Sequence, residues 1–245
     1  MTTAHQKVLL DQAVRTALTL YDDSRHLLRA SRFGHVLAPV ASLEFAALLL
    51  IRAAADPSRK AELGLARLLI DTVLPLQVRA PGLPLDGAFP LHWLPQPERQ
   101  NIGNAVTRLS RRVGLSDAAS PEEGVEPSLR TRLLPATLLE MLARGFGGLL
   151  GEKRVQRMRQ AVKRAMTGSM DPSTAPAAKI MLRAWLALEL GEAWEGERLA
   201  TEVVLRGGER MAADRFGDPH EQAGELWSLA LWQRQPRLQE SASGL

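Results

Sequence analysis

The stretch that decides the fold runs from residue 36 to residue 73 and reads VLAPVASLEFAALLLIRAAADPSRKAELGLARLLIDTV. Its first half is apolar on nearly every side, which is typical of a helix at the centre of a bundle. Asp56, Pro57 and Ser58 then interrupt the pattern. Residues of these types begin helices, because Asp and Ser cap the first turn and proline fits within it. The stretch therefore predicts two helices, at about 36–55 and 59–73, joined by a short turn.

Outward from this stretch, helical periodicity covers most of the chain, and no segment alternates convincingly between apolar and polar residues as a strand does. A first helix is predicted over 3–30, and its apolar stripe breaks at 31–34. Six prolines between residues 75 and 97 deny a helix its donors, so an extended connector is expected there. We therefore predict an all-α fold, a helical bundle with a C-terminal helical hairpin.

Four regions follow from these boundaries. They are an N-terminal helical bundle at 1–75, a Pro-rich connector at 76–97, a basic helical region at 98–168 and a C-terminal helical hairpin at 177–234. The basic region is expected to hold helices at 98–113, 127–144 and 151–167, the last two separated by glycines at 145, 147, 148 and 151. The final region is expected to hold helices at about 177–190, 192–213 and 219–234.

The composition excludes several classes of protein. The 245 residues are 45% hydrophobic and 24% charged, so the chain can bury a sizeable core and is not disordered throughout. The absence of cysteine excludes disulfides, thiolate metal sites and cysteine nucleophiles, and it fits a reducing compartment. No secretion signal is recognisable, and the most apolar run, at 43–51, is too short to cross a bilayer. We expect a cytoplasmic protein with no membrane partner.

Signatures of metal and cofactor chemistry are missing as well. The five histidines are scattered singly, so no metal-ligand spacing appears on one helix face. The segment 145–153 superficially resembles a phosphate-binding loop, but it lacks the Gly-Lys-Ser/Thr ending and a preceding strand. We therefore predict no metal ligands, no cofactor and no assigned catalytic residue.

Charge is distributed unevenly along the chain, whose net charge is +4. Nine basic and two acidic side chains give residues 128–170 a net charge of +7, whereas eight basic and twelve acidic side chains give residues 171–245 a net charge of −4. This asymmetry indicates that one surface meets an anion and that another does not.

A basic helix at 151–167 is the strongest single feature. At 100° per residue, Val155, Met158, Val162 and Met166 share one face, which is predicted to be buried. The other faces carry six cations, and a preceding helix carries three more that extend the surface if the two helices lie side by side. These nine candidate nucleic-acid-binding residues are Lys153, Arg154, Arg157, Arg159, Lys163, Arg164, Arg108, Arg111 and Arg112. Such a helix can follow the phosphate backbone of RNA or DNA without reading its sequence.

Alternatives to nucleic-acid binding stay open for this helix. A run of charge is often a solvated face, and the acidic C-terminal region offers it a partner within the same chain. An acidic protein partner is a further possibility. A continuous groove of exposed cations would favour nucleic acid, and cations covered by the acidic region would favour a structural or regulatory protein that binds no polyanion.

The C-terminal region has features of a partner-binding site. Its four tryptophans lie at helical spacings, which predicts core positions for most and interface anchors for some: Trp185, Trp194, Trp227 and Trp232. Gly191 separates two predicted helices, and Gly196 and Ala200 place small side chains on the second. In this respect residues 177–234 resemble a degenerate tetratricopeptide helical hairpin. The resemblance implies association with a protein partner or with a second copy.

The N-terminal helices carry a second resemblance. Residues 8–52 are similar to the opening helices of HEPN-type bundles, particularly the AbiV-like branch associated with phage defence, on the pattern Ala13, Ala17, Leu20, Leu27, Leu28, Leu37, Ala41, Glu44 and Leu48. The chain departs from the AbiV-like pattern after Glu44, where that pattern has a second acidic residue and a Gly-Lys pair. The resemblance implies a helical bundle and a place in antiviral defence.

A ribonuclease is the alternative function that this resemblance implies. HEPN ribonucleases use a His as acid or base at the ribose hydroxyl and an Arg that stabilises charge on the phosphorane. Arg29 with His35 and Arg215 with His220 have suitable spacings, but the first pair flanks a turn and the second lies beside a Gly-Asp-Pro loop. The leading hypothesis is a non-enzymatic helical adaptor or subunit of a larger ribonucleoprotein or defence assembly. It binds nucleic-acid backbone through the basic helix and a protein through the C-terminal hairpin.

Overall fold

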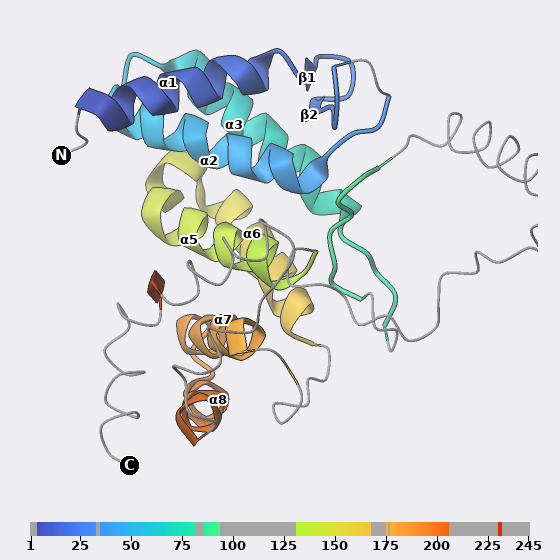
Figure 1. Ribbon diagram of the computed structural model, residues 1–245, viewed down its shortest axis with the longest axis vertical. Helices are drawn as coiled ribbons and strands as arrows, with labels where there is room; N and C mark the ends of the chain where they lie inside the picture. The colour runs from blue at the N-terminus through green and yellow to red at the C-terminus, as the bar shows by residue number, and fades with distance from the viewer. Residues whose placement is uncertain are drawn as a thin grey trace, which may run out of the picture.

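The computed structural model describes residues 4–32, 35–81, 86–93, 131–167, 175, 177–205 and 230–231. The helices are α1 (Ala4–Leu18), α2 (Pro39–Ala55), α3 (Lys60–Val73), the 3₁₀ turn η1 (Leu74–Leu76), α5 (Leu133–Leu150), α6 (Glu152–Met166), α7 (Ala177–Glu189) and α8 (Ala193–Leu205). The strands are β1 (Tyr21–Asp22) and β2 (Leu27–Leu28). In Figure 1, α1, α2 and α3 form the upper part of the fold, α5 and α6 the middle, and α7 and α8 the lower part. The predicted all-α class is confirmed.

Helix α2 lies at the centre of the upper part, as its all-round apolar sequence predicts. It packs against α1, α3 and α5, and residues on several of its sides are buried, among them Leu43, Phe45 and Leu50. Pro39 opens the helix at a position where its missing donor costs nothing. Each helix contributes buried apolar side chains to one continuous cluster, whose members range from Val14 to Leu231.

The first helix is shorter than predicted. It ends at Leu18, and the segment assigned to its second half forms the antiparallel pair β1–β2 instead. The Asp22 carboxylate accepts hydrogen bonds from the backbone amides of Ser24 and Arg25, and His26 has a φ of 54°, so the chain turns sharply between the strands. Local turn chemistry therefore overrides the helical spacing of the leucines that follow.

The connector after α3 lies against α6. Backbone hydrogen bonds join its two described segments: the Val78 amide donates to the Ala88 carbonyl, and the Gly87 amide donates to the Val78 carbonyl. The Gln77 side chain is buried, and its amide donates to the carbonyls of Gly87, at 2.9 Å, and of Ala161, at 2.8 Å. The described part of the connector is thus tied to α6.

The break predicted at the glycines 145–151 is present in part. Helix α5 is kinked at Phe146, where φ is −128° and ψ is 18°, and helical backbone then resumes and continues to Leu150. A glycine within a helix costs only about 1 kcal/mol, which the burial of Leu142, Ala143 and Leu150 offsets. The chain turns at Gly151, whose φ of 85° favours glycine.

Helix α5 is long and apolar enough to pass a length and composition test for a membrane span. Half of its residues are buried within the fold, where the helix packs against α2, α6 and α7. Its apolar character is therefore accounted for by a position in the middle of the bundle (Figure 1).

Helices α7 and α8 pack against each other as a helical hairpin, within the region 177–234. The turn passes through Gly191, with φ of 84°, and the Glu192 amide closes α7 by donating to the Ala187 carbonyl. Gly196 is buried where the two helices cross, as the small-residue spacing predicts. The third predicted helix, at 219–234, lies outside the described residues except for 230–231.

Candidate nucleic-acid interface

Helix α6 presents the predicted apolar face to the core. Met158 and Val162 are fully buried and Met166 is 7% exposed, while Val155 is half-buried. Ala161 and Ala165 complete this face. The cations consequently occupy the remaining sides of the helix, as the spacing predicts.

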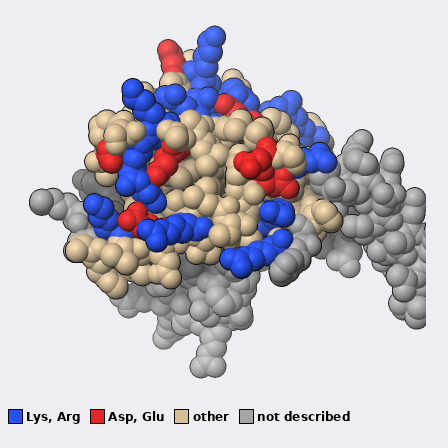
Figure 2. Space-filling view, turned by 90° about the horizontal axis from the view of Figure 1, so that it is seen from above, with Lys and Arg blue, Asp and Glu red and all other residues tan. Residues whose placement is uncertain are grey.

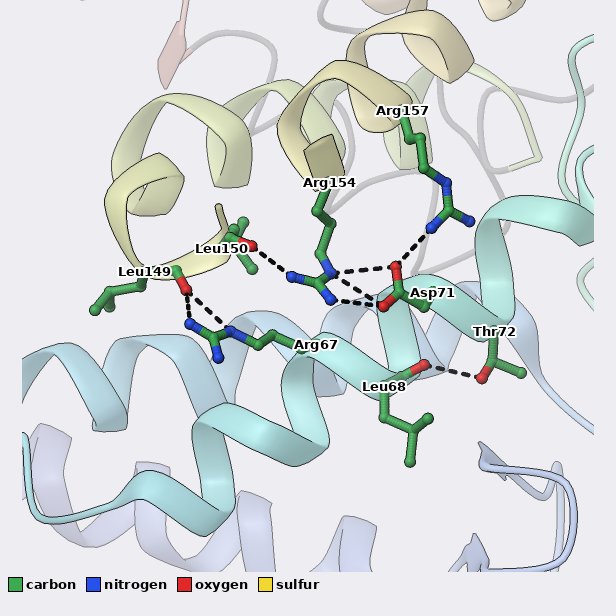
Figure 3. Close-up of polar contacts among 8 residues, drawn as sticks. All are labelled: Arg67, Leu68, Asp71, Thr72, Leu149, Leu150, Arg154 and Arg157. Atoms are coloured by element: carbon green, nitrogen blue, oxygen red, sulfur yellow. Dashed lines mark hydrogen bonds and ion pairs between the residues drawn. The ribbon is translucent and has the colours of Figure 1, made fainter. Parts of the chain in front are cut away.

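Asp71 on α3 binds two of these cations. Arg154 reaches the carboxylate with two nitrogen atoms, Nη2 at 2.7 Å from Oδ2 and Nε at 3.1 Å from Oδ1, and Arg157 Nη1 lies 2.9 Å from Oδ1. Figure 3 shows both side chains extending from α6 toward the same carboxylate. One carboxylate thus pairs with two guanidinium groups, so the cluster of Asp71, Arg154 and Arg157 has a net charge of +1.

Two arginines also bind the last carbonyls of α5. Arg67 from α3 donates to the Leu149 carbonyl, and Arg154 donates to the Leu150 carbonyl in addition to its contacts with Asp71 (Figure 3). The end of a helix leaves such carbonyls without intrahelical partners and carries a partial negative charge. Arg154 therefore joins α3, α5 and α6 at one point.

Arg159 faces a buried carboxylate. Its Nε lies 3.5 Å from Oε1 of Glu140 on α5, whose side chain is fully buried, and neither Glu140 oxygen forms a hydrogen bond within the described part of the chain. Burial raises the pKa of Glu140, and the nearby charge of Glu189 raises it further, while Arg159 opposes both effects. Glu189 on α7 is itself bound by Arg144. Two acidic and two basic side chains therefore meet where α5, α6 and α7 pack.

The three remaining cations of α6, Lys153, Lys163 and Arg164, differ in their surroundings. Arg164 donates to the side-chain carbonyl of Gln77, at 2.9 Å, and is only partly exposed. Lys153 and Lys163 are exposed, and the structure gives neither an ion pair nor a hydrogen bond with another described side chain. Asp71, Glu140 and Glu152 together offset half of the six positive charges. The charges that offset α6 come from α3, α5 and α6 itself, rather than from the described part of the acidic C-terminal region.

A pocket of about 350 Å³ opens at the start of α6. Its lining combines apolar surface with three cations and two carboxylates: Asp71, Leu150, Gly151, Glu152, Lys153, Arg154 and Arg157. No side chain caps the first turn of the helix, which begins after Gly151. The positive end of the helix dipole and three cationic side chains therefore converge on one opening.

Exposed cations elsewhere are more dispersed. Figure 2 shows the fold from the side of α1 and α3, where lysine and arginine side chains lie in separate groups around the rim with acidic side chains among them. This face carries no continuous basic track. The candidate interface in the described part of the chain is accordingly the exposed side of α6 and the pocket at its start.

Other predicted site residues are placed as follows. Arg108, Arg111, Arg112, Trp227 and Trp232 lie outside the described residues, as does the pair Arg215 and His220. Trp185 is buried in the core at 6% exposed, whereas Trp194 is 75% exposed. His35 is exposed and Arg29 is half-buried, and no hydrogen bond joins these two described residues.

Asp71, Glu140 and Gln77 are the partners of four α6 cations, and the spacing of the basic helix did not reveal them. One feature of the sequence could have indicated Asp71: it is the only carboxylate in the mostly apolar run 68–74. Such a residue in a buried helix needs a cationic partner. Which cation it meets depends on how α3 packs against α6, and spacing along the chain does not determine that.

Comparisons of the chain with family models, with curated proteins and with solved structures found no match. The function must therefore be argued from the residues of this chain alone.

Proposed function

We propose that the protein is a non-enzymatic helical adaptor that binds the phosphate backbone of nucleic acid through α6 and a protein through the α7–α8 hairpin. The observation that carries the first half is the pocket at the start of α6, where Lys153, Arg154 and Arg157 surround an uncapped helix end. Phosphate oxygens accept hydrogen bonds from guanidinium and ammonium groups, and a helix start adds a favourable dipole.

The free lysines of α6 support the same proposal. Lys153 and Lys163 are ten residues apart, which corresponds to about 15 Å along the helix. Neither lysine has an ion pair within the described structure. Both lysines can therefore neutralise phosphates without breaking a contact of the folded protein. Arg157, with 49% of its side chain exposed, can contribute as well because it shares the single charge of Asp71 with Arg154.

The test is fluorescence polarisation with labelled single-stranded RNA, single-stranded DNA and duplex DNA over a range of salt concentrations. The variant Lys153→Glu/Lys163→Glu reverses two charges without removing an ion pair. It should weaken binding to all three probes alike, and it should lower the slope of log K against log salt by about one for each phosphate that the protein no longer neutralises. Reversing Arg157 and Arg164 as well would be less informative, because it would also break their contacts with Asp71 and Gln77.

The matched control reverses two exposed lysines on other helices, Lys7→Glu on α1 and Lys60→Glu on α3. It changes the net charge by the same amount and should have a much smaller effect. Equal losses of affinity in the two variants would mean that only net charge matters, and this would contradict a specific role for α6. The absence of binding by the unmodified protein at low salt would contradict the proposal altogether.

The ribonuclease alternative receives no specific support from the described residues. We expect labelled RNA to stay intact when it is incubated with the protein. Cleavage by the unmodified chain that His35→Ala or Arg215→Ala abolishes would overturn the non-enzymatic proposal.

A further inference from the structure

Trp194 is a large apolar side chain on the helix face that carries Glu197, Arg198 and Thr201. At 100° per residue it lies about 180° from Val203, which is 1% exposed and belongs to the core. The Arg198 guanidinium lies 5.8 Å from the centre of the Trp194 ring, and 75% of the residue is still exposed. The amphipathic pattern of α8 is complete without this tryptophan, so the fold does not account for it. Exposed tryptophans of this kind are typical interface anchors.

The surroundings of Trp194 are acidic. Glu192 and Glu197, two and three residues from Trp194 in the chain, are exposed, and no ion pair is described for either. Glu195 is already shared by Arg183 and Arg198. A partner for this face should therefore combine an opening for an aromatic ring with positive charge.

The pocket at the start of α6 has both properties. Its volume of about 350 Å³ lies within the range of roughly 300–1,000 Å³ that is usual for pockets that take small molecules, and an indole ring is smaller than most such ligands. Leu150 gives the pocket an apolar wall, and the guanidinium groups of Arg154 and Arg157 can stack on an aromatic ring. Lys153, which also lines the pocket, complements the negative charge of the glutamates near Trp194.

Trp194 cannot reach the pocket of its own chain. The pocket includes Asp71 on α3, whereas α8 packs on α7, which in turn packs on α5. Figure 1 shows α8 at the lower end of the fold and α3 at the upper end. The pocket thus lies where α6 meets α3, whereas α8 lies beyond α7 in the lower part of the fold, so a contact between the two surfaces is one between two copies.

We infer that Trp194 of one copy inserts into the pocket at the start of α6 of a second copy, with the glutamates beside Trp194 facing Lys153. Because the two surfaces differ, the contact is head-to-tail. In a complex of two copies, one copy keeps an unused Trp194 and the other keeps an unused pocket, so further copies can be added. The pocket is also part of the proposed nucleic-acid interface. If that proposed function holds, nucleic acid and a second copy compete for it.

The experiment measures the mass of the full chain by sedimentation velocity and light scattering over a series of protein concentrations. The mass should rise with concentration and fall again at high salt. Trp194→Ala should reduce the association constant at least about tenfold, and Lys153→Glu should also reduce it. Val8→Ala removes an exposed apolar side chain from α1, at 63% exposed, and as a matched control should leave association unchanged.

Mixing the two variants tests the head-to-tail arrangement directly. Trp194→Ala keeps an intact pocket and Lys153→Glu keeps an intact Trp194, so a mixture should form complexes of two chains that do not grow further. A protein that is monomeric at every concentration would overturn the inference. So would association that is unchanged in Trp194→Ala, or association that depends on Trp194 but not on Lys153.

An oligonucleotide titration separates this inference from the proposed function. Self-association through Trp194 by a protein that binds no oligonucleotide would refute only the proposed function. Oligonucleotide binding by a strictly monomeric protein would refute only the inference. If both occur, oligonucleotide should lower the mass of the assembled protein, and an unchanged mass would overturn the competition.

Discussion

Arg154 binds Asp71 through two nitrogen atoms, so that a guanidinium on α6 and a carboxylate on α3 form a fork-shaped pair across the bundle. The same carboxylate also holds Arg157. Pairs of this geometry are stronger and more directional than ordinary surface ion pairs. The pair fixes the position of the first turn of α6, and at the same time it neutralises part of the charge that a polyanion would meet there.

Replacing Asp71 with Asn should separate these two effects. The variant Asp71→Asn should lose about 1–2 kcal/mol of stability, since the pairs are partly exposed. Removing the negative charge should strengthen binding of an oligonucleotide by about 1 kcal/mol, or roughly fivefold, at low salt. Denaturant unfolding and fluorescence polarisation measure the two quantities, and weaker binding by a folded Asp71→Asn protein would contradict the α6 interface.

The buried carboxylate of Glu140 predicts an unusual dependence of stability on pH. Its folded-state pKa is raised, chiefly by burial, so the protonated form is favoured in the fold more than in the unfolded chain. The free energy of unfolding should therefore decrease as the pH rises from about 4.5, the ordinary value, through the raised pKa. Glu140→Gln keeps the shape without the charge, and it should be more stable than the unmodified protein at pH 7.5 but not at pH 4.

The measurement is urea unfolding of both proteins at several pH values. The stability difference between them should grow with pH, and a difference that stays constant would contradict this account. Glu197→Gln serves as the control, because that carboxylate is exposed and has no described ion pair.

Gly87 is predicted to tolerate no side chain. Its φ is +80°, and a Cβ built on it would lie 2.8 Å from the Cα of Ala165 in α6. The variant Gly87→Ala combines left-handed backbone strain with a clash against rigid helix backbone, so it should lose about 2–4 kcal/mol. Thermal unfolding checks this, and a loss below about 1 kcal/mol would show that the connector is not held against α6 as described.

Gly196 is predicted to set the distance between α7 and α8. A Cβ at this position would lie 2.6 Å from Cγ of Leu188 and 3.2 Å from the Ala184 carbonyl oxygen. Gly196→Ala should therefore destabilise the protein by about 1–2 kcal/mol, although alanine is the better helix former. Gly64 on α3 has no atom within 4 Å of such a Cβ, and Gly64→Ala should instead stabilise by about 0.5–1 kcal/mol. Equal effects of the two variants would contradict close packing in the hairpin.

Periodicity was sufficient to predict α2, α3, α6, α7 and the start of α8, because each places apolar residues at helical spacing on a face that is then buried. It failed at Asp22, where a side chain that accepts backbone hydrogen bonds replaced the expected helix with a turn. At residues 145–148 it was right in part, because the helix is kinked at Phe146 among the predicted glycines, but helical backbone resumes and reaches Leu150 before the chain turns at Gly151.

The buried side of α6 was predictable for the same reason, but the ion-pair partners of its cations were not. Helical angles showed that Arg154 and Arg157 avoid the core, and they carried no information about Asp71, which is more than 80 residues away in the chain. The exposure of Trp194 could be computed from its angle opposite Val203. Tryptophan is so often a core residue that the pattern indicated burial for most of the four candidates.

The backbone hydrogen bond from the Phe89 amide to the Thr131 carbonyl, at 2.6 Å, joins two points that are far apart in the chain. Each side of this junction is anchored separately, by Gln77 on the connector and by the Arg132 side chain, which donates to the Ala165 carbonyl. Both anchors lie on α6, so the junction couples the position of the connector to that of the residues before α5 through the same helix that carries the pocket.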